Sequence, residues 1–452
     1  MIMRNEKLAA FLKPGKRVHM VGIGGVSMRP LALVLQDRGI TVTGSDMNSS
    51  GSTEELLRHG ISVAIGHREE NVQGADCIVR TAAAHNDNPE IAAARAAGIP
   101  VFERAQAWGM IMREYRNAIC VSGTHGKTTT TSMVTHVMME AKMDPTVMIG
   151  GALPLLGAGH RVGGGDTIVL ESCEYCDSFL NFYPTLAIIL NIEADHLDYF
   201  KDLEDVEKSF RAFAGLATNG ILANGDDCNT MDTLKGMEFV TFGLGEHNRI
   251  RAANISEDWS EFDVLCDGTV YTHLKLSVFG KHNTLNALAA AGAGWMLGVD
   301  GADVANGLAT FTGAGRRMEH KGEYNGAPVY DDYAHHPGEL ACLIDAVRTQ
   351  GYKRVVVAFQ PHTYTRTHAL FEDFIRELKR VDVCVVAEIY AARERNDIGI
   401  SSRDLVQHIP GATYCETLPQ VTEFLRENVR EGDIVLTVGA GDIYRAGEAL
   451  VK

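Results

Sequence analysis

Short apolar stretches of strand length alternate with longer helical patterns along almost the whole chain. This alternation is typical of α/β proteins, in which helices cover the faces of a mostly parallel sheet. The sequence therefore predicts an α/β fold. Expected strands lie at 17–21, 41–44, 77–80, 99–102, 118–122, 167–170, 186–190, 354–359, 383–387 and 433–438, and expected helices lie at 31–37 and 284–297.

The chain has 452 residues, and at about 100–200 residues per domain this length predicts two to four domains. The pattern of strand, glycine loop and helix starts near residue 17, restarts near residue 118, and a further unit begins near residue 313. We therefore expect three successive α/β domains, over 1–116, 117–312 and 313–452.

Composition excludes several classes of protein. The chain is 45% hydrophobic and 22% charged, which is ordinary for a globular protein. Its formal charge of −16, without a long basic tract, argues against nucleic acid as a partner. Nine cysteines are too few, and odd in number, for a disulfide scaffold. No apolar stretch has the length of a signal peptide or of a membrane span. We expect a cytoplasmic protein without a membrane partner.

The clearest motif is 123–131, which reads G-T-H-G-K-T-T-T-T between an expected strand and an expected helix. In such a loop Lys127 can reach the β- and γ-phosphates, Thr128 can offer its hydroxyl to Mg²⁺, and backbone N–H groups can cradle the anion. Val121 stands where the strict phosphate-loop pattern has its first glycine, so this is a shortened loop. The sequence predicts an ATP site here. The expected ATP-binding residues of the loop are Gly123, Thr124, Gly126, Lys127, Thr128 and Thr129.

Three further polar residues follow expected strands. Glu171 comes directly after one strand, and Asp195 and His196 come shortly after another. Residues at the carboxyl ends of parallel strands face the crevice where ligands bind. Carboxylate oxygens suit Mg²⁺, whereas histidine is a less typical ligand of so hard a cation. Taken singly, each of these residues could equally be a helix cap or a surface acid. Beside the phosphate loop, the candidate metal ligands are Thr128, Glu171 and His196.

The first glycine turn, 22–27, reads G-I-G-G-V-S and resembles the dinucleotide-binding fingerprint, with Ser27 in place of the third glycine. Asp46 ends the second expected strand, where a ribose-binding acid stands in that fingerprint. The pattern indicates a diphosphate or nucleotide ligand, and a tight structural turn would leave the same pattern.

One pair of cysteines and one pair of histidines could suggest metal or redox chemistry, but more weakly than the phosphate loop suggests an ATP site. Cys173 and Cys176 have a CxxC spacing, but no second pair follows at the distance of a zinc ribbon, which favours two reduced thiols. His335 and His336 are neighbours. On an extended segment their side chains point to opposite faces, so at most one serves a given site.

Taken together, five motifs resemble the Mur ligases of peptidoglycan synthesis, and they occur in that family's order over nearly the whole chain. They are 123–130 (GTHGKTTT), 191–198 (NIEADHLD), 280–286 (GKHNTLN), 315–319 (GRRME) and 331–337 (DDYAHHP). Within the family, the branch that adds L-alanine is the most similar. The segments that favour it are 21–25 (VGIGG), 331–337, 359–362 (FQPH) and 439–448 (GAGDIYRAGE).

The resemblance implies a Rossmann-like UDP-sugar-binding domain over 1–116, a central P-loop ATP-binding domain over 117–312 and a Rossmann-like amino-acid-binding domain over 313–452. It implies ATP and Mg²⁺ as cofactors and UDP-N-acetylmuramate and L-alanine as substrates. The implied reaction activates the sugar carboxylate as an acyl phosphate, which the amine of L-alanine then attacks.

The resemblance also implies roles for individual residues. Lys127, Glu171, His196 and Arg317 would be catalytic. Lys127 would bind phosphate, Thr128 and Glu171 the first Mg²⁺, and His196 a second metal. Asn283 and Asn286 would hold the adenine side of ATP, Arg317 the γ-phosphate and Asp332 the ribose. Tyr333, His335, His362 and Arg366 would hold the amino acid. Gly22, Gly24 and Gly25 would face the diphosphate, with Asp46 and His67 near the uridine.

The chain departs from the family pattern at several positions. Where the L-alanine branch usually reads E-A-D-E-S-D, Cys173 and Cys176 replace two carboxylates. Thr363 replaces an arginine, and Ser27 and Arg29 alter the first glycine loop. Phe210 and Arg211 stand where later ligases of the pathway carry a carbamylated lysine, although Lys208 is close by.

Three alternatives therefore stay open. The first is a recycling ligase that attaches a whole peptide to the same sugar nucleotide. The second is an NAD-dependent dehydrogenase, suggested only by the first glycine turn. The third is a non-catalytic nucleotide-binding regulator, suggested by the two lost acids.

Overall fold

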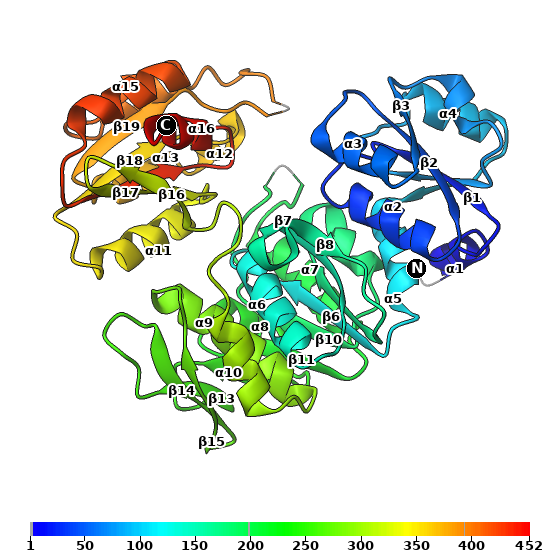
Figure 1. Cartoon of the computed structure of the whole chain (residues 1–452), viewed down its shortest axis with the longest axis horizontal. Helices are drawn as coiled ribbons and strands as arrows, with labels where there is room; N and C mark the ends of the chain where they lie inside the picture. Colours follow the sequence, from blue (N-terminus) through cyan, green and yellow to red (C-terminus); the bar gives the residue numbers. More distant parts are fainter. Residues whose placement is uncertain (1–2, 198, 393) are drawn as a thin grey trace. The chain divides into compact units, whose positions relative to one another are not determined.

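The structure is a computed structural model, and it describes residues 3–197, 199–392 and 394–452. Figure 1 labels the helices and strands along the chain. The chain divides into two compact units. The first unit contains Met1–Arg251, Val264–Thr272 and Asn286–Leu308, and the second contains Ala252–Asp263, His273–Leu285 and Ala309–Lys452.

The first sheet is parallel throughout and has the strand order β3-β2-β1-β4-β5. This is the order of a Rossmann-like half, in which the strand order reverses beside the first strand and ligands bind at that point. Its strands are β1 (Arg17–Val21), β2 (Thr41–Asp46), β3 (Ser62–Ile65), β4 (Cys77–Arg80) and β5 (Val101–Glu103). The helices of this part are α1 (Met3–Ala9), α2 (Met28–Asp37), α3 (Gly51–Arg58), η1 (Glu69–Val72), α4 (Pro89–Ala96) and α5 (Arg104–Met112).

The second sheet has the order β15-β14-β13-β12-β11-β10-β6-β9-β7-β8. Its strands are parallel from β13 to β7, and β8 is antiparallel to β7. The strands are β6 (Asn117–Ser122), β7 (Thr146–Leu153), β8 (Ala158–Arg161), β9 (Thr167–Glu171), β10 (Leu186–Ile189), β11 (Gly220–Asn224), β12 (Val240–Gly243), β13 (Ile250–Ala253), β14 (Glu261–Cys266) and β15 (Thr269–Lys275). The helices are α6 (Lys127–Glu140), η2 (Pro154–Leu156), η3 (Tyr175–Asn181), α7 (Leu203–Ala214), α8 (Cys228–Thr233), α9 (Lys281–Met296) and α10 (Gly301–Ala309).

The third sheet has the order β16-β17-β21-β18-β19-β20, with an antiparallel hairpin at one edge and parallel strands elsewhere. Its strands are β16 (Glu319–Tyr324), β17 (Ala327–Asp332), β18 (Arg354–Phe359), β19 (Val383–Ala387), β20 (Thr413–Cys415) and β21 (Asp433–Val438). The helices are α11 (Pro337–Arg348), α12 (Tyr364–Ala369), α13 (Phe371–Leu378), α14 (Ser402–Gln407), α15 (Leu418–Asn428) and α16 (Tyr444–Leu450).

The central strands are buried on both faces, which explains why they read as continuous apolar runs rather than alternating ones. In the first unit one apolar core continues from the first sheet into the second. Trp108 on α5 is fully buried in it, and its indole N–H donates to the carbonyl of Ser27 at 3.2 Å. Phe179 and Phe213 stack in the same core with their ring centroids 4.5 Å apart.

The predicted fold class is confirmed, because the chain forms α/β layers around three sheets with the parallel cores that the alternation indicated. The expected strands agree with the observed ones to within two residues at each end, and the expected helix at 284–297 is α9, which begins three residues earlier. The domain limits at 116 and 312 stay a prediction. In the described part of the chain, no helix combines the length and apolar character needed to cross a membrane.

Candidate active site

The phosphate loop lies at the carboxyl edge of the second sheet, between β6 and α6. Gly126 caps α6 with φ of 82°, a left-handed conformation that favours glycine. A Cβ atom at this position would also lie 2.8 Å from the side-chain oxygen of Asn286. The side-chain oxygen of Asn191 accepts the backbone N–H of His125 at 2.8 Å. The loop therefore connects a strand to the start of a helix, as the motif predicted. Asn191, in the loop after β10, supports it through this hydrogen bond.

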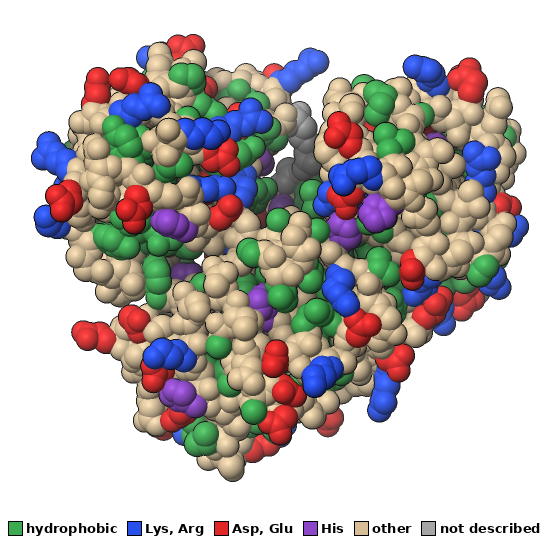
Figure 2. Space-filling view, in the orientation of Figure 1, with side chains coloured by type: hydrophobic (Ala, Val, Ile, Leu, Met, Phe, Trp, Pro, Cys, Tyr) green, Lys and Arg blue, Asp and Glu red, His purple; other side chains and the backbone are tan. Residues whose placement is uncertain are grey.

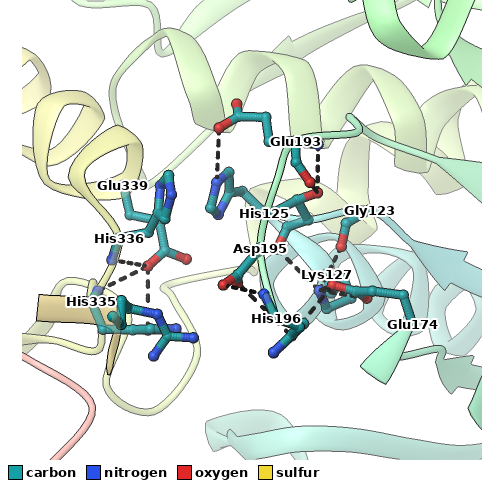
Figure 3. A network of polar contacts seen from close by, with 12 residues as sticks. Gly123, His125, Lys127, Glu174, Glu193, Asp195, His196, His335, His336 and Glu339 are labelled. Carbon is teal, nitrogen blue, oxygen red and sulfur yellow. Dashed lines mark hydrogen bonds and ion pairs between the residues drawn. The ribbon is translucent and has the colours of Figure 1, made fainter. Parts of the chain in front are cut away.

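Lys127 occupies the first position of α6, and its ammonium group turns back over the loop (Figure 3). It donates to the carbonyl oxygens of Gly123 and Thr124, and it lies 3.1 Å from both carboxylate oxygens of Glu174. Burial by itself lowers the pKa of Lys127, but the charge of Glu174 and its hydrogen bond, together with the nearby Cys173 and Glu171, raise the pKa by more. The lysine is therefore held as a cation in the loop that would receive phosphate.

Glu174 is the residue of this site that sequence reasoning missed. Its side chain is only 2% exposed and is ion-paired with Lys127. It stands two residues before an unusual bend, where Cys176 and Asp177 adopt left-handed backbone angles. Glu174 matches the second glutamate of the pattern E-A-D-E-S-D, but nothing in the local sequence indicated that its carboxylate turns to the lysine.

Glu171 and Thr128 lie on neighbouring elements of the same edge. The Glu171 carboxylate accepts the backbone N–H of Gly150 at 2.7 Å, and a Cβ atom at Gly150 would lie 2.8 Å from one of its oxygens. Thr128 is buried in the first turn of α6, two residues after the loop glycine. A hydroxyl and a carboxylate are oxygen donors of the kind Mg²⁺ prefers, so these two residues fit such an ion.

His196 lies in the loop after β10, with φ of 55°. Its Nε2 is 3.6 Å from a Glu174 carboxylate oxygen and 3.8 Å from Asp195 (Figure 3). The Tyr175 ring packs on the imidazole at a centroid distance of 4.8 Å. Glu171 ends β9 and His196 lies in the loop after β10, and these two strands flank β6 in the sheet. Asp198, the last residue of the 191–198 motif, lies outside the described residues.

The two asparagines expected at the adenine are one turn apart on α9. Asn286 accepts the hydroxyl of Thr130 at 3.0 Å, next to the phosphate loop. The Asn283 side chain donates to the carbonyl of Phe279 at 2.9 Å. Both are mostly buried. Their part in binding adenine stays a prediction.

In the first sheet, Asp46 braces the glycine turn. Its carboxylate accepts the backbone N–H of Gly24 at 2.9 Å, and Gly22 adopts φ of 78°. The two residues that depart from the fingerprint are also engaged. Ser27 accepts the Trp108 indole, and Arg29 pairs with Glu55 at 2.8 Å. The turn and Asp46 are thus brought together, while the expected place of Asp46 at the uridine stays a prediction.

His67 belongs to a buried polar cluster around Glu90, which sequence reasoning also missed. Glu90 is fully buried. It accepts the hydroxyl of Ser45 at 2.6 Å and the side chain of Asn71, and its carboxylate lies 3.3 Å from His67 and 3.6 Å from His19. Burial would raise the pKa of Glu90, but its hydrogen bonds and the nearby His19 lower it to about 2. Nothing in the sequence indicates that Glu90, which stands in the first turn of a helix, is buried.

The second unit carries Arg317 and the predicted amino-acid-binding residues. Arg317 lies 3.6 Å from one carboxylate oxygen of Glu339, and its guanidinium stacks on Tyr333 at 5.3 Å. The other oxygen of Glu339 accepts the backbone N–H of His335 at 2.9 Å and lies 3.3 Å from the His335 ring (Figure 3). Glu339, not foreseen from the sequence, therefore joins Arg317 to His335.

Tyr333, His335, His362 and Arg366 are brought together in this unit. The rings of Tyr333 and His335 are 5.4 Å apart, those of His335 and His362 are 6.1 Å apart, and Arg366 lies 3.3 Å from the His362 ring. His336 instead caps α11, where its ring accepts the N–H of Gly338. The two neighbouring histidines thus make different contacts.

Asp332 ends β17 and is buried. Its carboxylate accepts the backbone N–H groups of Met318 and Ala334, each at 2.8 Å. Burial raises its pKa to about 6, against the opposing charge of Arg317. Thr363 caps α12 with φ of 65°, which is strained for a β-branched residue. It does not replace the lost arginine charge.

Charged side chains of both signs are interspersed on the face seen in Figure 2. Basic side chains thus lie among acidic ones on this face, although the whole chain carries a formal charge of −16. Lys208, close to the position of the carbamylated lysine in later ligases, is 67% exposed and pairs with Glu204 at 2.7 Å.

Comparison with known proteins places the chain in a family. Residues 17–116 match the Mur ligase family catalytic domain, residues 121–294 the Mur ligase middle domain, and residues 316–441 the Mur ligase glutamate ligase domain. The chain belongs to the Mur ligase family.

Curated relatives are similar over nearly their full length. The chain is 43% identical to the UDP-N-acetylmuramate–L-alanine ligase of Caldanaerobacter subterraneus subsp. tengcongensis over 452 residues, with 98% of each chain covered. It is 44% identical to the protein of the same name from Acetivibrio thermocellus, covering 97% of this chain and 96% of that one.

Solved structures are similar as well. The crystal structure of the UDP-N-acetylmuramate–alanine ligase of Thermotoga maritima has a TM-score of 0.81 and 30% identity, covering 96% of this chain and 98% of that one. A murein peptide ligase from Psychrobacter arcticus has a TM-score of 0.72 and 23% identity, with the same coverage, and shares the fold.

Proposed function

We propose that the protein is an ATP-dependent ligase that joins L-alanine to the carboxylate of UDP-N-acetylmuramate in peptidoglycan synthesis. The observation that carries the proposal is Lys127, a buried cation at the start of α6, beside the acids of the neighbouring loops. The names of relatives that are 43–44% identical over nearly full length support the substrates.

In the proposed reaction, the carboxylate of the sugar nucleotide attacks the γ-phosphorus of ATP to give an acyl phosphate and ADP. The amine of L-alanine then attacks the acyl carbon, and inorganic phosphate leaves. Negative charge develops first on phosphoryl oxygens and then on a tetrahedral oxyanion, and fixed positive groups stabilise such charge most effectively. No protein nucleophile is required.

Residue roles follow from the resemblance and from the observed contacts. Lys127 and the N–H groups of the loop, from Gly123 to Thr129, would bind the phosphates of ATP. When bound, Mg²⁺ neutralises phosphate charge, and Thr128 and Glu171 would hold the first ion and His196 a second. Arg317 would bind the γ-phosphate and Asp332 the ribose, with Asn283 and Asn286 at the adenine. Gly22, Gly24, Gly25, Asp46 and His67 would bind the UDP sugar, and Tyr333, His335, His362 and Arg366 the amino acid.

The proposal includes action in the cytoplasm, where ATP is supplied. The nine cysteines are all free thiols, which fits a reducing compartment. The dehydrogenase alternative rested on the glycine turn alone and is not favoured by a chain that matches Mur ligase domains in all three parts. The regulator alternative is not favoured either, because Lys127, Glu171 and His196 are all retained around the loop.

The test is phosphate release from ATP with UDP-N-acetylmuramate and one acceptor at a time. We expect release to require the sugar nucleotide and to be fastest with L-alanine. Glycine and L-serine are the controls, because one methyl group contributes only about 1–3 kcal/mol to the discrimination between such amino acids. Release that ignores the sugar nucleotide would overturn the proposal. Faster release with an L-alanyl peptide would make the protein a recycling ligase.

A further inference from the structure

The loop after β9 brings a thiol into the charged part of the site. Cys173, Glu174 and His196 each offer one ligand atom, and these three atoms all lie within 4.8 Å of one another. Cys173 is partly buried and Glu174 almost wholly so. The Mg²⁺ ligands proposed above include His196 but neither Cys173 nor Glu174. The sulfur is therefore a donor without a part in the proposed reaction.

The spacing of these atoms suits a small ion. Two donors on one tetrahedral Zn²⁺, at about 2.0–2.3 Å from the metal, lie roughly 3.3–3.6 Å apart. Nε2 of His196 and the carboxylate oxygen of Glu174 are 3.6 Å apart. Only the Cys173 sulfur has to move closer to the other two donor atoms, by no more than about 1.5 Å. A rotation about χ1 of the cysteine can supply this movement.

The backbone holds the donors in place. His196 has φ of 55°, and its N–H donates to the Asp195 carboxylate at 2.7 Å. Past Cys173, the left-handed residue Asp177 accepts the hydroxyl of Tyr199 at 2.8 Å. Non-glycine residues in this conformation are costly and persist where surrounding contacts impose them, often at functional sites.

We propose that Cys173, Glu174 and His196 form a binding site for a thiophilic divalent cation of the Zn²⁺ type, with one position left for water or substrate. Sulfur and imidazole nitrogen select such ions, whereas Mg²⁺ prefers oxygen. On binding, the Cys173 sulfur bonds to the metal and the thiol proton leaves to solvent. The inference shares His196 with the proposed function but rests on the geometry of these three residues.

Lys127 supplies an internal check. Its ammonium group lies 3.1 Å from the same Glu174 carboxylate, so it competes with a cation for that ligand and repels it. Removal of the lysine charge is therefore expected to tighten cation binding, although the same change removes phosphate binding. A site that did not include Glu174 would respond far less.

The experiment is a Co²⁺ titration of the full chain without nucleotide or Mg²⁺, because Co²⁺ replaces Zn²⁺ and a cobalt–thiolate bond absorbs in the near ultraviolet. We expect one equivalent to give this band, Zn²⁺ to remove it, and a hundredfold excess of Mg²⁺ to leave it. Cys173→Ser and His196→Gln should weaken binding at least tenfold. Lys127→Met should tighten it several-fold.

The matched control is Cys176→Ser, which removes the other, exposed thiol of the CxxC pair and should leave the band unchanged. Circular dichroism and the melting temperature establish that each variant is folded. Cys173→Asp is a second variant without the thiol, and it should lose the thiolate band as Cys173→Ser does. The absence of a thiolate band, its loss in Cys176→Ser, or its removal by Mg²⁺ would each overturn the inference. Because no substrate is present, none of these results bears on the ligase proposal.

Discussion

The ammonium group of Lys127 lies 3.1 Å from both carboxylate oxygens of Glu174, 47 residues further along the chain. Glu174 is 2% exposed and Lys127 14% exposed, so the pair is largely shielded from water. Removing one partner of such a pair leaves an uncompensated buried charge. The group that would bind phosphate is thus held by an internal anion.

We expect Lys127→Met to reduce phosphate release by at least about 10²–10³-fold, since it removes a charge that would stabilise the transferred phosphoryl group. It should also lower stability by about 3–5 kcal/mol, because Glu174 loses its partner. Phosphate release and thermal unfolding measure the two effects. The double variant Lys127→Met/Glu174→Gln should recover the melting temperature but not the turnover. Undiminished turnover would remove the phosphate loop from the mechanism.

Glu174→Gln should tighten the binding of ATP in the absence of divalent cations. The carboxylate competes with the phosphates for Lys127, so its neutralisation should lower Kd by roughly tenfold, about 1.4 kcal/mol. Isothermal titration calorimetry measures this. Glu140→Gln, which makes the same charge change at the exposed far end of α6, is the control and should leave Kd unchanged. Weaker binding in Glu174→Gln would contradict the competition.

Glu339→Gln should lower kcat/KM by about ten- to a hundredfold for both ATP and L-alanine, because Glu339 contacts both Arg317 and His335. A hydrogen bond to a charged group is worth about 1.5–3 kcal/mol. Steady-state kinetics with each substrate varied in turn measures the loss. Glu372→Gln, an exposed acid in the first turn of α13, is the control. A loss confined to one substrate would show that Glu339 does not couple the two groups.

Glu90 should make the protein sensitive to acid. The pKa of Glu90 is about 2 in the folded chain and about 4.5 when unfolded, so its contribution is present above pH 4.5 and is lost as the pH falls toward 2. The shift corresponds to about 3 kcal/mol. Glu90→Gln should lower the melting temperature at pH 7 and flatten its decline between pH 4.5 and pH 3. An unchanged decline would show that Glu90 is not the group responsible.

Glu69→Gln is the matched control for that experiment. Glu69 is an exposed acid on η1, close to Glu90 in the fold but outside its polar cluster. The melting temperature of the Glu69→Gln variant should equal that of the unchanged protein at every pH. Equal effects of the two substitutions would assign the acid sensitivity to net charge rather than to the buried carboxylate.

The sequence by itself determined the α/β class, the phosphate loop and the family. These features are local, because a strand, a glycine with positive φ and a helix start follow from residues that are adjacent in the chain. Gly126 and Lys127 stand where the motif placed them. Ordered motifs over nearly the whole chain then made the family resemblance specific, and the matched domains agree with it.

Only the tertiary structure decided which partners these residues have. Glu174 meets Lys127 because the loop after β9 lies at the edge of the sheet that also carries the phosphate loop. Glu90 is buried because α4 packs its first turn against the carboxyl end of β2, a position that reads in the sequence as an ordinary helix start. Such contacts depend on how distant segments pack, and periodicity along the chain contains no record of that packing.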